Sequence, residues 1–98
     1  MATEYNVINN QVLLHFEIQL GDDIGFMEYR FNKNNIVLMH TQVPKSMEGK
    51  GVAPALAKYA FDYAREHYHP VVVYCPYVLT YLKRHPELNE LLDKPGNP

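Results

Sequence analysis

A short turn containing two glycines is the part of this sequence whose residue types point most directly to chemistry. The segment reads Glu48-Gly49-Lys50-Gly51-Val52-Ala53, with a strand-like region before it and an amphipathic stretch after it. Glycine leaves main-chain N–H groups uncovered, and a helix that follows adds the positive end of its dipole. The two features together suit a phosphate group. The turn therefore predicts a phosphate-binding site, with an ordinary loop at the start of a helix as the alternative.

Cys75 and His40 also have side chains that could take part in a reaction. Cys75 directly precedes Pro76, where a helix is expected to begin, and a helix N-terminus favours the thiolate form of cysteine. It could act as a nucleophile or be a small buried apolar residue. His40 lies on an expected strand, and an imidazole can take a proton from an amine near neutral pH. A structural histidine within the sheet is the competing interpretation. The five histidines show no spacing typical of a metal site, so no metal is predicted.

The elements that must position these residues follow from the hydrophobic pattern. Apolar residues alternate between Gln11 and Leu20, as in a half-buried strand. With turns at Asn9-Asn10, at 21–23 and at 32–35, the pattern predicts strands over 5–9, 11–20, 24–31 and 36–43. Pro44 ends the fourth strand because proline cannot donate a hydrogen bond to a sheet.

The second half of the chain changes to a helical period. A helix is predicted from Gly51 to about His67, with an apolar face of Val52, Leu56, Tyr59, Ala60 and Tyr63. The apolar run 71–74 predicts a strand covered on both faces. A second helix begins at Cys75-Pro76, and its apolar side is Val78, Leu79 and Leu82. Leu88, Leu91 and Leu92 are expected to pack in a last short turn before the tail. The fold class is α+β (α/β): antiparallel strands, a β-α-β crossover to a parallel fifth strand, then a C-terminal helix.

Size and composition limit the function further. We expect one domain over residues 1–98, with its core at 5–92 and a tail at 93–98. The net charge of −2 excludes a general nucleic-acid footprint. Lys45, Lys50 and Lys58 nevertheless gather around the glycine turn, which favours a small anionic ligand. No signal peptide or membrane-length apolar run is visible, so we expect a cytoplasmic protein without a membrane partner.

Taken together, these segments resemble the GCN5-related N-acetyltransferases (GNAT). The acetyl-CoA motif of that superfamily, Q/R-x-x-G-x-G/A, aligns with Glu48 to Ala53, where Gly51 and Ala53 match and Glu48 departs from the pattern. Three other segments are similar to its small single-domain, YjdJ/NATD1-like branch: His40-Thr41-Gln42-Val43-Pro44, Cys75-Pro76-Tyr77 and residues 81–87. The resemblance extends over about residues 5–92.

The resemblance implies acetyl-CoA as co-substrate and an amine as acceptor. Residues Glu48, Gly49, Lys50, Gly51, Val52 and Ala53 would then hold the pyrophosphate of CoA. Main-chain groups of Met39, Thr41 and Val43 would run beside the pantetheine arm. Tyr81 aligns with the tyrosine that many members use to protonate the departing thiolate. Cys75 would lie near the acetyl thioester, either as a nucleophile or only as part of the pocket wall.

The chain is short for this fold, since Asn9-Asn10 leaves room only for a turn where typical members insert two helices. Those helices commonly form part of the acceptor site, so their absence implies an open acceptor side. The function expected is transfer of acetyl from acetyl-CoA to an amine by direct attack, and the acceptor remains open between a small amine, a polyamine and a protein amine. Two alternatives are an acyl-CoA-binding module without transfer activity and a protein-interaction domain on the same fold.

Overall fold

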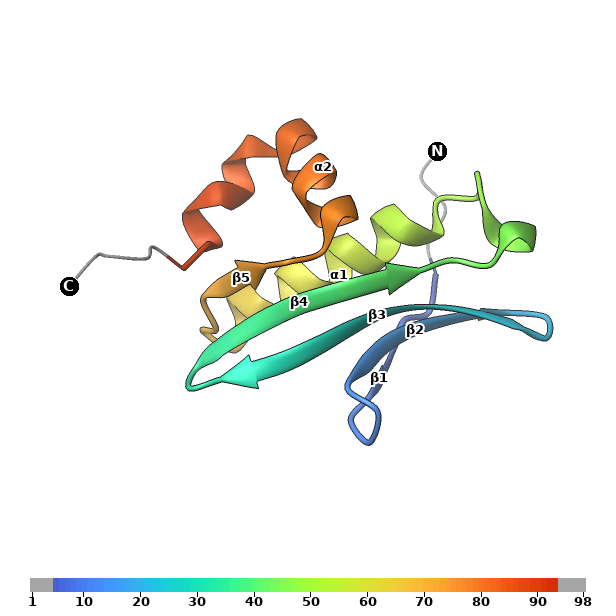
Figure 1. Cartoon of the computed structure of the whole chain (residues 1–98), viewed down its shortest axis with the longest axis horizontal. Coiled ribbons are helices and arrows are strands. Elements are labelled where there is room, and N and C mark those ends of the chain that lie inside the picture. The colour runs from blue at the N-terminus through green and yellow to red at the C-terminus, as the bar shows by residue number, and fades with distance from the viewer. Residues whose placement is uncertain (1–4, 94–98) are drawn as a thin grey trace.

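A five-stranded sheet with the strand order β1-β2-β3-β4-β5 is the framework of the structure, a computed structural model that describes residues 5–93 (Figure 1). The first four strands are antiparallel, and β4 and β5 are parallel. This confirms the predicted fold class. The elements are β1 (Ile8–Asn10), β2 (His15–Leu20), β3 (Asp23–Asn32), β4 (Asn35–Gln42), the 3-10 turn η1 (Lys45–Met47), α1 (Val52–Glu66), β5 (Val71–Val73), α2 (Pro76–Arg84) and the 3-10 segment η2 (Pro86–Leu91).

The hairpin between β1 and β2 differs from the prediction. The strand expected over 5–9 starts only at Ile8, and the strand expected from Gln11 starts at His15. The side-chain Oδ1 of Asn10 accepts hydrogen bonds from the backbone N–H groups of Val12 and Leu13, both at 3.1 Å. An asparagine that bonds the backbone in this way offers the chain an alternative to strand pairing. Residues 11–14 therefore form a turn, and Val12, expected to point inward, is 92% exposed.

The core lies between one face of the sheet and α1. The sheet contributes Phe16, Ile18, Met27, Tyr29, Ile36 and Leu38. The buried face of α1 is wider than predicted, because Ala57, Phe61 and Ala64 join Val52, Leu56 and Ala60, while Tyr59 and Tyr63 are only half-buried. On α2 the prediction was wrong for Leu79, which is 50% exposed, and right for Val78 and Leu82.

Two further expectations were wrong, one for β5 and one for the end of the chain. Tyr74 lies outside β5 and is 66% exposed, so the run 71–74 is not covered on both faces along its length. Asp93, assigned to the tail, donates its N–H to the carbonyl of Val71 at 2.8 Å. Leu88 and Leu91 of η2, and Leu92 directly after it, pack against the core as expected. The rest of the predicted tail, 94–98, lies outside the described residues.

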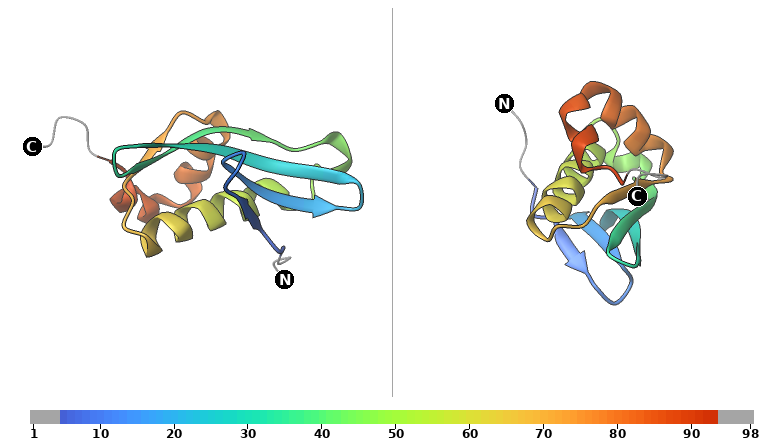
Figure 2. Two further views of the ribbon diagram at one scale, coloured as in Figure 1. Left: turned by 90° about the horizontal axis from the view of Figure 1, so that it is seen from below. Right: turned by 90° about the vertical axis from the view of Figure 1, so that its left-hand side faces the viewer.

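The helices occupy one side of the sheet. Figure 2 shows α1 beneath the strands, and α2 continues the same layer beside β4 and β5. Over the described residues 5–93, no helix covers the opposite face, which we call the open face. The strand register places His15, Glu17, Phe26, Glu28 and His40 there. Within the same range, no helix has the length and apolar character needed to cross a bilayer.

Gly25 sets how closely the start of α1 approaches the sheet. A Cβ at this buried glycine of β3 would lie 2.9 Å from Cγ1 of Val52 and 3.5 Å from Cε of Met47. Val52 is the first residue of α1 and is itself buried, with stiff branched geometry at its Cβ. Only glycine at position 25 therefore allows the observed position of the helix start.

Replacing Gly25 by alanine should lower the free energy of unfolding by about 1–3 kcal/mol, the usual cost of overpacking a core. In the background of Val52→Ala, which removes the clashing methyl group, the same change should cost less. Chemical denaturation of the four proteins of this double-mutant cycle gives the coupling between the two sites. Additive effects would show that the two residues do not constrain each other.

Candidate functional site

The glycine turn has the backbone geometry of an anion-binding loop. Gly49 and Gly51 both have positive φ, at 74° and 77°, and Gly51 is the N-cap of α1. No side chain caps this helix, and its first turn contains no acidic residue. Among residues 5–93, the backbone N–H groups from Gly49 to Ala53 donate no hydrogen bond. Uncapped N–H groups at the positive end of a helix dipole attract an anion.

The turn forms one wall of an open pocket of about 330 Å³. Six residues predicted for cofactor binding contribute to its lining: Val43, Glu48, Gly49, Gly51, Val52 and Ala53. Met47 and Pro54 complete it, whereas Met39, Thr41 and Lys50, which were also predicted, do not line it. The pocket therefore joins the end of β4 to the start of α1, although these segments are separated by η1 in the chain.

Contacts that the sequence did not reveal hold the turn in place. The hydroxyl of Tyr5 donates to the carbonyl of Lys50, which connects the N-terminal segment to the turn. The hydroxyl of Ser46 in η1 donates to the carboxylate of Asp23 at the start of β3. Met47, 2% exposed, anchors η1 in the core. Hydrophobicity alone marks Met47 as a core residue, but no local pattern links Tyr5 to position 50.

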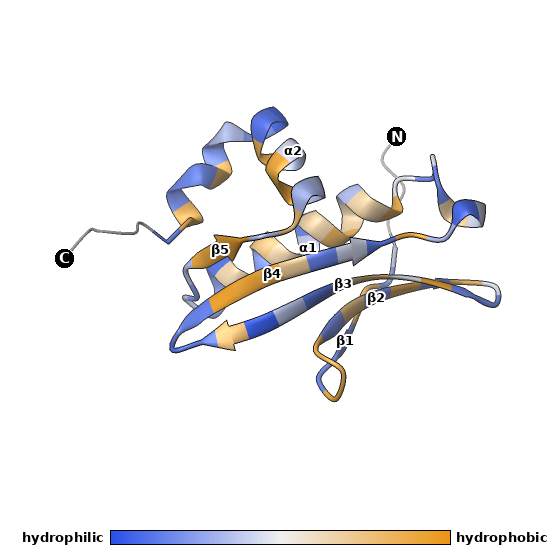
Figure 3. Cartoon of the chain, in the orientation of Figure 1, coloured by the Kyte–Doolittle hydropathy of each residue, from blue (hydrophilic) through white to orange (hydrophobic). Residues whose placement is uncertain are grey.

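The second part of the site is the gap that opens between β4 and β5. β5 pairs with β4 only from Ile36 to Leu38, and the carbonyl of Leu38 then accepts the N–H groups of Tyr74 (2.9 Å) and Cys75 (3.0 Å). Beyond this point β4 pairs with β3 alone, through residues 40–42. Figure 3 shows β4 changing from apolar to polar where β5 ends. The backbone edge of residues 39–42 is thus available to polar groups of a ligand.

A β-bulge marks where this gap begins. Tyr29 pairs with Leu38 and Glu28 pairs with His40, so Met39 is the extra residue on β4. A bulge re-aims the side chains that follow it and ends regular pairing. Met39, predicted for its main chain, therefore lies at the point of separation.

Thr41 and Cys75 face each other across the gap. Thr41 Oγ1 and Cys75 Sγ are 3.1 Å apart, and either atom can be the donor. Cys75 is 1% exposed and precedes α2, which begins at Pro76 as predicted. Thr41 was predicted only for its main chain. The structure gives that side chain a specific partner.

Tyr81 lies on α2 against α1. Its ring stacks on His85 at 4.2 Å between centroids and faces Phe61 of α1 at 6.3 Å. Burial raises the pKa of Tyr81; nearby Lys58 opposes this, and Asp62 and Glu87 add to it. Within residues 5–93 its hydroxyl makes no hydrogen bond, and the raised pKa keeps it protonated at neutral pH. Burial also raises the pKa of Tyr77, one turn earlier on the same helix.

His40 is placed apart from Cys75. Its cross-strand neighbour is Glu28 on the open face, whereas the adjacent Thr41 points to the other side of the sheet, toward Cys75. The structure therefore unites Thr41 with Cys75 at the gap and leaves His40 across the strand from both.

The three lysines near the turn are exposed, and Lys58 pairs with Asp62 at 2.8 Å. Over the described residues, no group of three or more histidine, cysteine or acidic side chains has the arrangement of a metal site.

Comparison with known proteins defines the class. Residues 15–91 match the family model described as GCN5-related N-acetyl-transferase, and the chain belongs to this family. A similar relative is Protein NATD1 of Xenopus tropicalis, 37% identical over 74 residues that cover 72% of this chain and 68% of that protein. Protein NATD1 of Danio rerio is 28% identical over 89 residues, covering 88% of this chain and 81% of that protein.

A solved structure has the same fold. The solution structure of a GCN5-like candidate N-acetyltransferase from Staphylococcus aureus superimposes with a TM-score of 0.71, covering 93% of this chain and 90% of that one. The sequence identity is 21%, so this likeness concerns the fold. The family resemblance that the glycine turn and the segments around it suggested is confirmed.

The raised pKa values of Tyr77 and Tyr81 predict a loss of stability in alkali. The fold favours their neutral forms, so their contribution is complete below the ordinary tyrosine pKa of about 10 and is lost as the pH rises through and beyond it. Denaturant unfolding from neutral to alkaline pH should show this fall. A variant with phenylalanine at both positions should fall less steeply, and an identical slope would contradict the assignment to these two rings.

Proposed function

We propose that this protein is an acetyl-CoA-dependent N-acetyltransferase in which an amine attacks the thioester directly. The observation that carries the proposal is the run of N–H groups from Gly49 to Ala53, uncapped at the start of α1 and open to a pocket beside the end of β4. This is a suitable place for the pyrophosphate of CoA. The family to which the chain belongs supports the same cofactor.

The gap between β4 and β5 suits the rest of the cofactor. The pantetheine arm carries two amides, and the unpaired edge of residues 39–42 offers backbone donors and acceptors for them. An arm that runs from the glycine turn along Val43 and Thr41 would bring its thioester near the bulge at Met39. Cys75 would then lie beside the acetyl group.

In the reaction, the nitrogen of a neutral amine forms a bond to the acetyl carbon while the carbon–sulfur bond breaks. The amine gives up a proton and the CoA sulfur takes one. We assign Tyr81 as the donor to the sulfur, because its hydroxyl stays protonated and unbonded among the described residues. His40 is assigned as the base, since it lies on the face opposite Cys75 where the amine has free access.

An acyl-CoA-binding module without transfer activity is the second candidate. The acidic Glu48 in the pocket lining favours it, because its charge opposes a pyrophosphate where the family motif has glutamine or arginine. Calorimetry with acetyl-CoA and thiol release with a panel of amines distinguish the two functions. Binding without thiol release for any amine would select the binding module. No binding would leave an interaction domain.

Replacing Gly51 by alanine should weaken acetyl-CoA binding at least about tenfold, or ~1.4 kcal/mol, because a methyl group would enter the space of the phosphate. Gly21→Ala is the matched control: Gly21 also has positive φ, at 62°, and an added Cβ meets nothing at either position. Both changes should cost about 1–2 kcal/mol of stability. Only the change at position 51 should alter the binding constant measured by calorimetry.

Glu48→Gln should move the same binding constant in the opposite direction, since it removes a negative charge from the pocket. If the Gly51→Ala and Gly21→Ala proteins bind acetyl-CoA with equal affinity, the pyrophosphate lies elsewhere.

Replacing Tyr81 by phenylalanine should lower turnover by about 10²-fold and leave the affinity for acetyl-CoA nearly unchanged, because a proton donor acts on the step that releases thiolate. Tyr77→Phe, one turn earlier and of similar burial, is the control and should change turnover by less than about threefold. Steady-state kinetics with a responsive amine measure both. If the two variants lose turnover equally, packing of α2 explains the effect and Tyr81 is not the donor.

Cys75 should line the site without forming a covalent intermediate, because a positioned amine can reach the thioester directly. Cys75→Ala should therefore keep most of the transfer activity. Intact-mass spectrometry after incubation with acetyl-CoA should find no acetyl group on this residue. An acetylated Cys75 that forms and decays at the rate of turnover would establish a two-step reaction instead.

A further inference from the structure

We propose that Tyr5 is a positioning residue for the phosphate site: its hydroxyl group holds the peptide between Lys50 and Gly51 in the orientation that turns the N–H of Gly51 toward the pocket. The inference rests on the proposed function, because it concerns the turn assigned to the pyrophosphate of CoA. Position 5 lies outside residues 15–91, the range that matches the family model. The family match therefore gives Tyr5 no role.

The contact joins the segment before β1 to the glycine turn. The hydroxyl of Tyr5 is the donor and the carbonyl oxygen of Lys50 is the acceptor, since a carbonyl cannot donate. The ring of Tyr5 is half-buried and packs against the core, so the hydroxyl is carried on a fixed body. In Figure 1 the segment before β1 runs toward the start of α1, and the hydrogen bond connects the two.

The carbonyl of Lys50 needs a partner from outside the helix. In an α-helix a carbonyl accepts from the N–H four residues later, and for Lys50 that residue is Pro54, which has no N–H. The carbonyl of Gly51, the N-cap, accepts from Ala55 at 3.2 Å, so the helical pattern begins one residue after Lys50. Within the part of the chain that the structure describes, no backbone N–H donates to the Lys50 carbonyl. Tyr5 supplies the donor that the backbone does not.

A fixed carbonyl at Lys50 also fixes the N–H of the next residue. The peptide bond is planar and trans, so the C=O of Lys50 and the N–H of Gly51 point in opposite directions. Gly51 lines the pocket, whereas Tyr5 and Lys50 do not. An oxygen held by Tyr5 on the side away from the pocket therefore leaves the N–H of Gly51 directed toward it.

Without the hydroxyl group of Tyr5, this peptide can reverse. Gly49 and Gly51 both have positive φ, and glycine adopts φ of either sign at little cost. A reversal of the peptide plane between Lys50 and Gly51 would aim the oxygen of Lys50 at the pocket. A carbonyl oxygen repels a phosphate, whereas a run of N–H groups attracts it. The hydrogen bond from Tyr5 thus selects the binding orientation before the ligand arrives.

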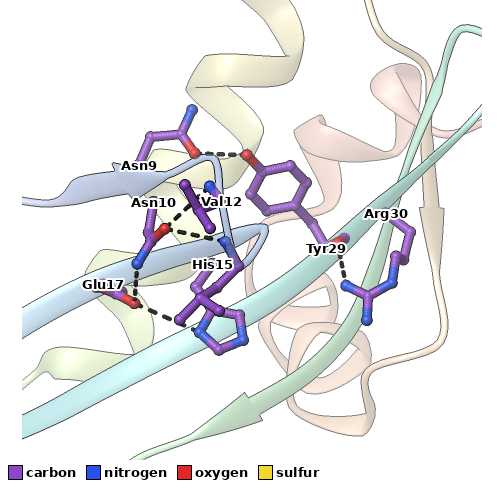
Figure 4. Close-up of polar contacts among 8 residues, drawn as sticks. Asn9, Asn10, Val12, His15, Glu17, Tyr29 and Arg30 are labelled. Atoms are coloured by element: carbon purple, nitrogen blue, oxygen red, sulfur yellow. Dashed lines mark hydrogen bonds and ion pairs between the residues drawn. The ribbon is translucent and has the colours of Figure 1, made fainter.

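The other end of the same segment is anchored as well. The side-chain Oδ1 of Asn9 in β1 accepts a hydrogen bond from the hydroxyl of Tyr29 at 2.6 Å (Figure 4). Tyr29 is 1% exposed and belongs to the core, and β1 pairs with β2 along its whole length. Tyr5 therefore approaches the turn from a fixed strand, which lowers the conformational entropy lost when its hydroxyl holds the peptide.

The test compares Tyr5→Phe with Tyr29→Phe in the whole chain, by amide-shift titration with inorganic pyrophosphate and by calorimetry with acetyl-CoA. Both changes remove one hydroxyl that ties down the N-terminal segment, but only the first releases the carbonyl of Lys50. Tyr5→Phe should weaken the binding of both ligands at least about threefold, because a smaller fraction of the protein presents the N–H of Gly51. Tyr29→Phe, the matched control, should change either affinity by less than about 1.5-fold.

A second arm measures the orientation of the peptide itself, without any ligand. In a weakly aligned sample, the residual dipolar coupling of the Gly51 N–H reports the direction of that bond. Tyr5→Phe should change this coupling, and Tyr29→Phe should leave it as in the unaltered protein. A purely structural role for Tyr5 would lower stability and move neither the coupling nor the affinities.

Three results would overturn the inference: equal affinities of the two variants for pyrophosphate, a Gly51 coupling that Tyr5→Phe leaves unchanged, and an unaltered protein that does not bind pyrophosphate. Binding of pyrophosphate that depends on Tyr5, together with no binding of acetyl-CoA, would support the inference and refute the proposed function alone.

Discussion

The early separation of β4 from β5 is the constraint on which the site depends. Three residues of β5 pair with β4, and the carbonyl of Leu38 then accepts two N–H groups and closes the pairing. Beyond it, β4 has no strand partner on the side of β5 at residues 39–42, of which Met39, His40 and Gln42 are exposed and Thr41 is half-buried. The bulge at Met39 and the contact between Thr41 and Cys75 both lie at this opening. A ligand with amides along its length could pair with this edge, and this is why we propose that the pantetheine arm of CoA lies there.

The position of α1 is the second requirement, because its N-terminus must lie beside the end of β4. Gly25 permits the close approach of Val52, and Met47 secures the connecting turn in the core. Alanines along the buried face of α1 keep the helix near the sheet. Packing in the core is thus what aims the uncapped N–H groups at the pocket.

Much of the fold was predictable because local patterns matched tertiary structure. The strands predicted over 24–31 and 36–43 from the turns that bound them correspond to β3 and β4 within one residue at each end, and Pro76 began α2 as expected. The hairpin was not predictable from alternation, because the side chain of Asn10 accepts hydrogen bonds from the backbone N–H groups of Val12 and Leu13. Leu79 was misplaced because the face that α2 buries is decided by α1 and β4.

The candidate site was predictable as a set of segments and not as a geometry. The glycine turn was predictable from sequence because its proposed role depends on backbone groups that glycine leaves uncovered. A pocket lies beside it. The bulge at Met39 and the opposite placement of His40 and Cys75 depend on strand register, which no single segment encodes.

The central claim is that acetyl-CoA extends from the glycine turn into the gap. Backbone amide shifts during an acetyl-CoA titration test it most directly. The account predicts the largest changes at Gly49 to Ala53, with a second group at residues 39–42 and Cys75; changes confined to the open face or to the far end of α1 would contradict it.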